Sequence, residues 1–331
     1  MSGIPHVSSE GRVKGMKTVL LENDLVKLVA LVDRGSDIVE LVYKPKNVDL
    51  LWHAPPGLRS PSKCGSLLPT PETGFMDYYG GGWQDLLPTI GSGPVKLHGA
   101  TFGQHGETGV LPWDAEVHTE GKTAVAKLGV NGVRYPYRLE KTLTLDGTEL
   151  MISERLTNTS KQTLEFYWLQ HPSFGEPFLA PGCVIELPLG SVVTNIASIN
   201  SLGRVADGQF DWPKVRAKDG GEIDLSVIPP KSVTAEESTF IRVKEGWYNF
   251  TNPTLGLRVR FEWDASVFPW VWFWQNYWTP DYPYYGNAWN VAIEPATSLP
   301  TILGEHAAKD ALVLKGGQSK ATDIRVKIDV L

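Results

Sequence analysis

The sequence predicts an all-β protein, a large antiparallel β-sandwich, on three observations. Several segments alternate hydrophobic and polar residues at a period of two, which is the spacing of a strand with one buried face. The 331 residues include 33 glycines, 24 prolines and 12 tryptophans, so turn-forming and aromatic residues are both frequent. Helical periodicity is confined to a short piece near residues 305–312. Closely spaced strands with little helix favour a sandwich over a parallel α/β fold.

The predicted strands run along the whole chain. The segments 257–263 and 324–330 alternate strictly, with apolar side chains on one face and charged side chains on the other. Further strands are expected, in chain order, at residues 25–32, 38–43, 124–130, 137–145, 150–156, 164–170, 271–275 and 289–293. The polar stretch 201–238 is expected to be a long loop or excursion. Because strand patterns resume on both sides of it, residues 1–331 are expected to form a single domain.

The charge balance limits the classes of ligand. Lysine and arginine total 31 against 37 aspartate and glutamate, a net charge of −6. This argues against nucleic acid, which needs clustered positive charge, and less strongly against an anionic membrane. No apolar run reaches the roughly 18 residues of a membrane span, and no secretory signal is visible. We expect a cytoplasmic monomer or homodimer that binds a neutral or small polar ligand.

The two cysteines, Cys64 and Cys183, lie far apart in the sequence, and no CxxC or His/Cys cluster marks a metal site. Buried free thiols are the expected state, and a single disulfide is the alternative. No metal and no cofactor are expected. If a metal were bound, aspartate and glutamate in loops would favour Ca²⁺.

Two glycine-rich segments carry polar residues of catalytic type. Residues 78–88 contain three consecutive glycines and are expected to form a loop that presents Trp83, Gln84 and Asp85 to a ligand. The alternative is a strand-connecting turn capped by the aspartate. Residues 96–113 contain His98, His105 and Glu107 on a segment expected to lack regular structure, where a histidine could bind a polar ligand or serve the fold alone.

Two further segments place a titratable side chain at the end of a predicted strand. The first strand runs into His171, and Pro172 is expected to end its ladder. The second delivers Glu294 directly before Pro295. Between Trp263 and Trp289 lie twelve of the 34 aromatic residues. Aromatic faces in a loop-lined cleft can stack on the apolar faces of sugar rings.

Three segments resemble the aldose 1-epimerase (galactose mutarotase-like) family. Residues 105–113, from His-Gly to Trp, resemble its HG-x-x-x-x-x-x-W segment, residues 171–174 its HPYF-like segment, and residues 293–298 its IEP-x-T segment. They occur in the family's order, and the resemblance spans about residues 25–330. It implies a supersandwich with the sugar in an open cleft on one sheet. It also implies an isomerase that interconverts the α and β anomers of a free or modified sugar.

The resemblance implies roles for three residues. Glu294 is expected to be the general base that takes the proton of the sugar's C1 hydroxyl, and His171 the general acid that protonates the ring oxygen. His105 is expected to hydrogen-bond the substrate near that oxygen. A carboxylate and an imidazole suit acid–base ring opening near neutral pH without a cofactor.

Other residues define an altered pocket. Ser92 follows Gly91 where relatives often carry an arginine, and the pair Trp274 and Gln275 also points to a divergent branch. We expect Trp83, Gln84, Asp85, Trp274 and Gln275 to contact substrate. Arg34 could serve an acidic or phosphorylated sugar, with a structural role at a strand end as the alternative.

Alternative functions stay open at this stage. A non-catalytic carbohydrate-binding protein on the same fold would keep the aromatic cleft without turnover. An epimerase or isomerase of another modified sugar would keep both catalytic groups. A glycosidase would need two carboxylates at a defined separation, with Asp281, Glu107 or Glu176 as partner of Glu294.

Overall fold

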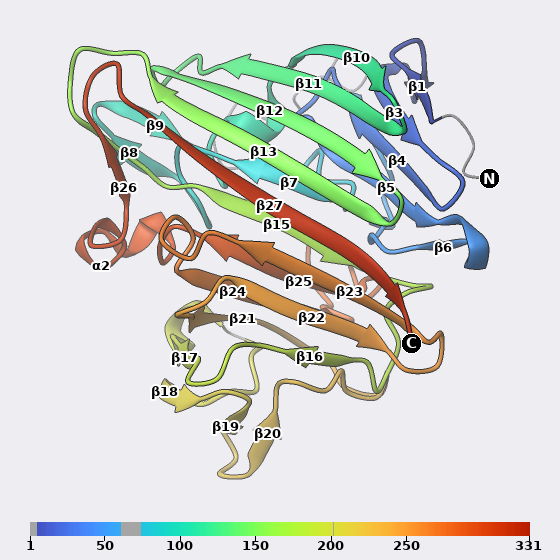
Figure 1. Ribbon diagram of the computed structural model, residues 1–331. Coiled ribbons are helices and arrows are strands. Elements are labelled where there is room, and N and C mark those ends of the chain that lie inside the picture. Colours follow the sequence, from blue (N-terminus) through green and yellow to red (C-terminus); the bar gives the residue numbers. More distant parts are fainter. Residues whose placement is uncertain (1–4, 61–73, 201) are drawn as a thin grey trace.

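Two large antiparallel sheets packed face to face form the framework of the protein (Figure 1). The computed structural model describes residues 5–60, 74–200 and 202–331. A thirteen-stranded sheet has the order β1-β3-β4-β5-β7-β15-β25-β24-β21-β17-β18, with β2 paired to β3 and β6 to β5. An eight-stranded sheet has the order β10-β11-β12-β13-β27-β23-β22-β16. The predicted all-β antiparallel sandwich is confirmed.

The strands have the following bounds. The thirteen-stranded sheet contains β1 (His6–Ser8), β2 (Arg12–Val13), β3 (Met16–Glu22), β4 (Val26–Leu31), β5 (Ile38–Tyr43), β6 (Val48–Asp49), β7 (Trp83–Leu86), β15 (Leu169–Phe174), β17 (Val192–Asn195), β18 (Gly208–Asp211), β21 (Ala235–Arg242), β24 (Trp270–Tyr277) and β25 (Trp289–Ala296). The eight-stranded sheet contains β10 (Asp114–Glu120), β11 (Thr123–Asn131), β12 (Tyr137–Asp146), β13 (Glu149–Asn158), β16 (Val184–Glu186), β22 (Trp247–Asn252), β23 (Leu257–Trp263) and β27 (Ser319–Val330). Three two-stranded ribbons pair β8 (Val95–Leu97) with β9 (Ala100–Phe102), β14 (Leu164–Phe166) with β26 (Leu312–Leu314), and β19 (Lys214–Arg216) with β20 (Glu222–Asp224).

The two strictly alternating segments are neighbours. Strand β27 pairs with β23 on one side and β13 on the other, so the C-terminal strand joins two parts of the chain that are far apart in sequence. The apolar face of β23, including Val259 and Phe261, is buried between the sheets, and Phe261 packs on Trp83 of the opposite sheet. The alternation therefore identifies the buried face correctly.

A second apolar cluster lies on the other face of the thirteen-stranded sheet. Its members include Trp52, Phe75, Tyr79, Trp272 and Tyr284. The ring of Trp52 packs against those of Tyr79 and Tyr284, and the ring of Tyr79 stacks on Phe75. The thirteen-stranded sheet is thus buried on both faces in its middle. The face that turns away from the eight-stranded sheet carries the candidate site.

Several local predictions need correction. Residues 83–86 are not a loop but the central strand β7, between β5 and β15. Pro172 does not end its strand, because β15 continues to Phe174. Part of the glycine-rich segment 96–113 is a short hairpin, β8–β9, and the excursion 201–238 contains β18 and the β19–β20 ribbon. These strands are only three to six residues long, so period-two alternation has too few residues to reveal them.

The remaining local predictions concern a helix and the thiols. The helix expected near residues 305–312 is the single turn α2 (Glu305–Ala308). Cys183 is a buried free thiol, whereas Cys64 lies outside the described residues. No helix in the described ranges is both long and apolar enough to cross a membrane.

Candidate active site

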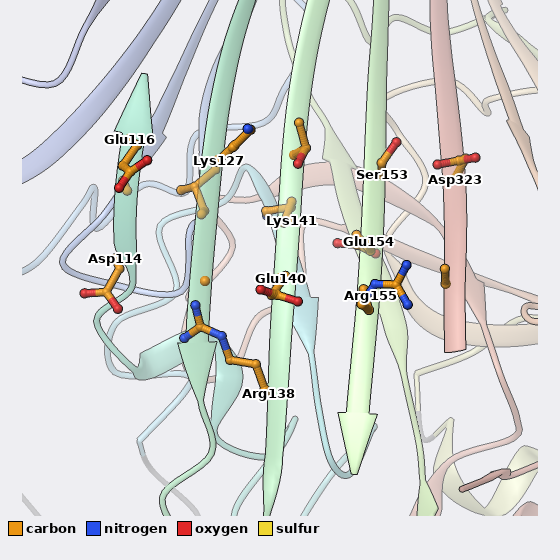
Figure 2. A pocket seen from close by; sticks show the side chains of 15 residues that line it. Asp114, Glu116, Lys127, Arg138, Glu140, Lys141, Ser153, Glu154, Arg155 and Asp323 are labelled. Carbon is orange, nitrogen blue, oxygen red and sulfur yellow. The ribbon is translucent and has the colours of Figure 1, made fainter. Parts of the chain in front are cut away.

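Among the hollows in the described part of the chain, two differ clearly in their chemistry. One is an open groove of about 560 Å³ on the outer face of the eight-stranded sheet, lined by side chains of both charges on β10, β11, β12, β13 and β27 (Figure 2). Its described lining includes no histidine and no aromatic residue. The other is a cavity of about 210 Å³ on the thirteen-stranded sheet, lined by two histidines, two glutamates and several aromatic side chains. The second hollow is the candidate active site.

The register of the sheet brings His171 and Glu294 together. On strands β15 and β25, Leu169 pairs with Ala296 and Ser173 with Ala292. Counting inward from both pairs places His171 directly opposite Glu294, where side chains on one face lie about 4.5–5.5 Å apart at Cβ. Two residues separated by more than a hundred positions therefore become cross-strand neighbours.

Two prolines lie beside this pair. Pro172 follows His171 and Pro295 follows Glu294, and the β15–β25 ladder is interrupted between the Leu169–Ala296 and Ser173–Ala292 pairs. Neither proline has an N–H to donate, so the ladder cannot close through them. The strands nevertheless stay in register because β7 pairs with β15 on one side and β24 pairs with β25 on the other. The same row continues as Gln84, His171, Glu294, Trp272 and Phe240 across five strands.

Burial shifts the pKa values of His171 and Glu294. His171 Nε2 lies 3.6 Å from Glu294 Oε1, and both side chains are almost fully buried. Burial raises the pKa of Glu294 well above its usual value. Burial also lowers the pKa of His171 to about 4, although a hydrogen bond to its own backbone carbonyl opposes this shift. Each shift disfavours the charged form, so burial favours the state in which the imidazole is neutral and the carboxyl keeps its proton.

Two hydroxyls lie on the other side of the His171 ring. Tyr79 Oη is 3.4 Å and Ser173 Oγ 3.3 Å from His171 Nδ1, and the two oxygens are 2.6 Å apart. Ser173 is two residues after His171 on β15, so its side chain lies on the same face of the sheet. Tyr79 reaches the ring from the turn that precedes β7.

His105 also lines the cavity, and its ring centroid lies 5.5 Å from that of His171. Its Nδ1 accepts a hydrogen bond from the backbone N–H of Gly91 at 3.1 Å, and its ring packs edge-on against Phe75. Burial, with a smaller effect of His171, lowers the pKa of His105 well below its usual value. The neutral ring therefore carries its proton on Nε2 and can donate to a ligand. The residue after His105 must be a glycine, because a Cβ on Gly106 would lie 2.1 Å from the Leu87 carbonyl oxygen.

Aromatic and polar side chains complete the walls. Trp272, Trp274 and Tyr284 are among the aromatic lining residues, and Trp272 is held by a hydrogen bond from Nε1 to the Ser298 carbonyl. A second carboxyl, Glu236, lines the cavity from β21, and burial raises its pKa. Ser92, Gln104, Asn200 and Ser238 are further polar members of the lining.

Of the nine predicted site residues, the cavity lining contains four: His105, His171, Trp274 and Glu294. Gln275 is next to Trp274 on β24, and its side chain lies on the opposite face, where its Oε1 accepts a hydrogen bond from Arg204 at 2.8 Å. Alternation along the strand therefore separates the pair.

The loop predicted to present Trp83, Gln84 and Asp85 is a strand, so their side chains alternate between its faces. Trp83 donates from Nε1 to Gln170 Oε1 at 2.8 Å within the core between the sheets. Asp85 is buried there as well and forms an ion pair with Lys141. Gln84 lies on the site face beside His171, but its amide donates to the Gly81 carbonyl and it is outside the cavity lining.

Arg34 has the structural role that was the alternative in the sequence analysis. Its guanidinium is buried, pairs with Asp37 at 2.7 Å and donates to the Tyr78 carbonyl. It thereby supports the turn that carries Phe75 and Tyr79, behind the cavity wall and outside its lining. Asp37 has a pKa of about 6, raised by burial against the opposing charge of Arg34.

The other candidate carboxylates also have structural partners. Glu107 accepts hydrogen bonds from the backbone N–H groups of three consecutive residues, 133–135, and Glu176 pairs with Lys231 at the surface. Neither these residues nor Asp281 line the cavity. In the described ranges, no group of three or more histidine, cysteine, aspartate or glutamate side chains is arranged to hold a metal ion.

Sequence reasoning missed Tyr79, Ser173 and Glu236. Ser173 could have been found, because it follows His171 by two residues on a strand. Glu236 alternates with Ser238 and Phe240 on β21, a strand that lies in and beyond the segment expected to be an excursion. Tyr79 has no local signal, because it reaches His171 across the fold.

Solved structures share this fold over nearly the whole chain. A proposed aldose 1-epimerase from Klebsiella pneumoniae subsp. pneumoniae MGH 78578 has a TM-score of 0.75 and 15% identity, covering 98% of this chain and 83% of its own. A galactose mutarotase-like protein from Clostridium acetobutylicum has a TM-score of 0.70 and 15% identity, covering 99% of both chains. The Slr1438 protein from Synechocystis sp. PCC 6803 has a TM-score of 0.68 and 17% identity, covering 98% of both. At these identities the likeness establishes the galactose mutarotase-like fold alone.

Sequence comparison leads to a family defined without an activity. No curated protein matches the chain significantly. One family model, described as "Domain of unknown function (DUF4432)", matches residues 13–328, which include every cavity residue described above. The chain therefore belongs to the DUF4432 family and carries its domain on a galactose mutarotase-like β-sandwich.

Proposed function

We propose that the protein is an isomerase that interconverts the α and β anomers of a sugar by acid–base ring opening. The observation that carries this proposal is the buried cross-strand pair of His171 and Glu294, which lies within a cavity walled by aromatic side chains. Ring opening needs one group to take a proton and another to give one at the same small molecule. The names of the solved structures with this fold agree with the same chemistry.

The reaction conserves protons. Glu294, as a carboxylate, removes the proton of the C1 hydroxyl while the bond between C1 and the ring oxygen breaks. The electron pair of that bond passes to the ring oxygen, which takes a proton from the His171 imidazolium, and an open-chain aldehyde forms. After rotation about the C1–C2 bond, the reverse steps close the ring as the other anomer and restore both groups. The imidazolium–carboxylate form that starts the reaction has the same proton count as the neutral pair.

We propose an uncharged sugar as the substrate. The described lining residues include two carboxyl groups, Glu236 and Glu294, and no lysine or arginine. Arg34, the candidate partner for an anionic sugar, is buried against Asp37 behind the wall. A phosphate or carboxylate on the substrate would lie near carboxyl groups without a compensating cation. Glu236 and Ser92 instead suit the hydroxyls of a neutral ring.

The test is anomer exchange measured by NMR saturation transfer. Glucose, galactose and other neutral aldoses are compared with glucose 6-phosphate and glucuronate. We expect accelerated exchange of a neutral aldose, reduced about 10²–10⁴-fold in Glu294→Gln and in His171→Asn. The matched controls are Glu165→Gln and His98→Asn, which remove an exposed histidine–carboxyl pair elsewhere on the fold and should leave exchange unchanged.

The other outcomes separate the alternatives. Exchange of the anionic sugars alone would overturn the proposed substrate class. No exchange by the wild type, with sugar binding retained in Glu294→Gln, would favour a non-catalytic carbohydrate-binding protein.

A further inference from the structure

We infer that Ser173 and Tyr79 are positioning residues that hold His171 in its Nδ1–H tautomer, so that Nε2 alone exchanges protons. The inference rests on the proposed function for its catalytic consequence. It stands on the two hydroxyl oxygens that lie 3.3 Å and 3.4 Å from Nδ1, on the side of the ring away from Glu294.

The chemistry of imidazole explains why the tautomer matters. The nitrogen that faces Glu294, Nε2, must gain and lose a proton during ring opening and closing. A neutral imidazole cannot give up its remaining proton near neutral pH. The ring therefore has to cycle between the imidazolium and the neutral form that keeps a proton on Nδ1. In both forms Nδ1 carries a hydrogen that needs an acceptor, and the two hydroxyls supply one.

The hydroxyls of Tyr79 and Ser173 are arranged so that they can accept a hydrogen bond from Nδ1–H. Burial is the main cause that raises the pKa of Tyr79, so the phenol keeps its proton. Tyr79 Oη can donate that proton to Ser173 Oγ at 2.6 Å, and a second lone pair of Ser173 Oγ stays available for Nδ1–H. Ser173 is fully buried, which limits competition by water for this lone pair.

An uncharged hydrogen-bond acceptor at Nδ1 also suits the role of His171 as a general acid. A carboxylate behind a histidine ring stabilises the imidazolium and makes it a weaker proton donor. The two side chains that lie within hydrogen-bond reach of Nδ1 in the described part of the chain are uncharged hydroxyls. The two hydroxyls therefore orient the His171 ring without making its imidazolium a weaker proton donor to the ring oxygen of a sugar, as a carboxylate at Nδ1 would.

The tautomer can be read directly in the ligand-free protein. Long-range ¹H–¹⁵N correlation NMR on protein labelled with ¹⁵N-histidine distinguishes the two tautomers, and His171→Asn identifies the resonances. We expect Nδ1–H in the wild type and a growing share of Nε2–H in Ser173→Ala, in Tyr79→Phe and most of all in the double variant. Ser191→Ala removes a buried serine hydroxyl that donates to the Pro188 carbonyl elsewhere and should change nothing.

Kinetics supply the second readout. Ser173 is outside the cavity lining, so Ser173→Ala should lower kcat about tenfold with little change in KM. A wild-type ring protonated on Nε2, or a folded double variant that keeps the wild-type tautomer, would overturn the inference. Thermal unfolding shows whether each variant is folded. Because the tautomer is measured without sugar, its result stands even if no sugar is turned over, and the two proposals fail separately.

Discussion

At the scale of single residues, burial favours the neutral forms of Glu294 and His171, which lie side by side in the cavity. Glu294 and His171 are each shifted toward the neutral form, in opposite pKa directions. A carboxyl with its usual pKa would be ionised at neutral pH, and an exposed histidine would titrate near 6.5. Burial of both side chains therefore widens the pH range over which the pair holds one proton.

This proton count predicts the pH dependence of activity. Below about pH 4, where His171 gains a proton, the pair holds two protons and lacks a base. Above the raised pKa of Glu294 the pair holds none and lacks an acid. We expect kcat/KM for anomer exchange to be level between these two limits and to fall beyond each of them, as measured by saturation transfer at controlled pH. A single inflection near 6.5, the ordinary value for histidine, would contradict this account.

At the scale of elements, strand alternation decides which neighbours reach the cavity. His171 and Ser173 of β15 lie on the site face, whereas Gln170 between them lies in the core between the sheets. Trp274 and Gln275 are separated in the same way. Residues that are adjacent in the sequence and could both bind a ligand therefore lie on opposite faces of the sheet.

The turn that carries His105 gives a prediction at this scale. Gly106 has a φ of +73°, and a Cβ there would clash with the backbone at Leu87. We expect Gly106→Ala to destabilise the protein by more than about 1 kcal/mol, because both backbone strain and the clash oppose folding. Displacement of His105 should also raise KM. The control is Gly99→Ala, which has a similar φ of +88° with open space around it. Denaturant unfolding compares the two, and equal losses would show that the contact with Leu87 is unimportant.

At the scale of the whole molecule, a buried polar network joins the two sheets. Asp85 of β7 forms an ion pair with Lys141 of β12. Gln170 of β15 donates to Asp85 at 2.5 Å and to Glu154 of β13 at 2.9 Å. Burial and the charge of Asp85 raise the pKa of Glu154 well above its usual value. Burial alone would raise the pKa of Asp85 too, but Lys141 and hydrogen bonds outweigh it and lower that pKa.

This network predicts how stability depends on pH. Because the folded-state pKa of Glu154 exceeds the unfolded value, folding takes up a proton, and this contribution is lost as pH rises through the folded pKa. Glu154→Gln stays neutral and can still accept from Gln170. We therefore expect its free energy of unfolding to fall less with rising pH than that of the wild type, measured by urea unfolding between about pH 5 and 9. Glu149→Gln, on the same strand but partly exposed, is the control. Parallel curves for Glu154→Gln and the wild type would contradict the shift.

The sequence by itself determined the class of fold and the chemistry available to it. Alternation in β23 and β27 identified buried faces, because the period of a strand depends only on local backbone geometry. The two segments in which a proline follows a titratable residue identified His171 and Glu294, although both lie within strands and not at strand ends. The Gly-rich segment identified His105, and all three side chains line one cavity.

Only the tertiary structure decided which side chains meet. The register of β15 against β25 sets His171 opposite Glu294, and the turn before β7 brings Tyr79 to the far side of the imidazole. Arg34 instead pairs with Asp37 in its own turn and donates to the distant Tyr78 carbonyl, whereas Asp85 pairs with Lys141 of the opposite sheet. The pairing of distant strands depends on which faces of the sheet become buried in the folded protein. The local sequence pattern of a strand does not show which other strand it will pair with.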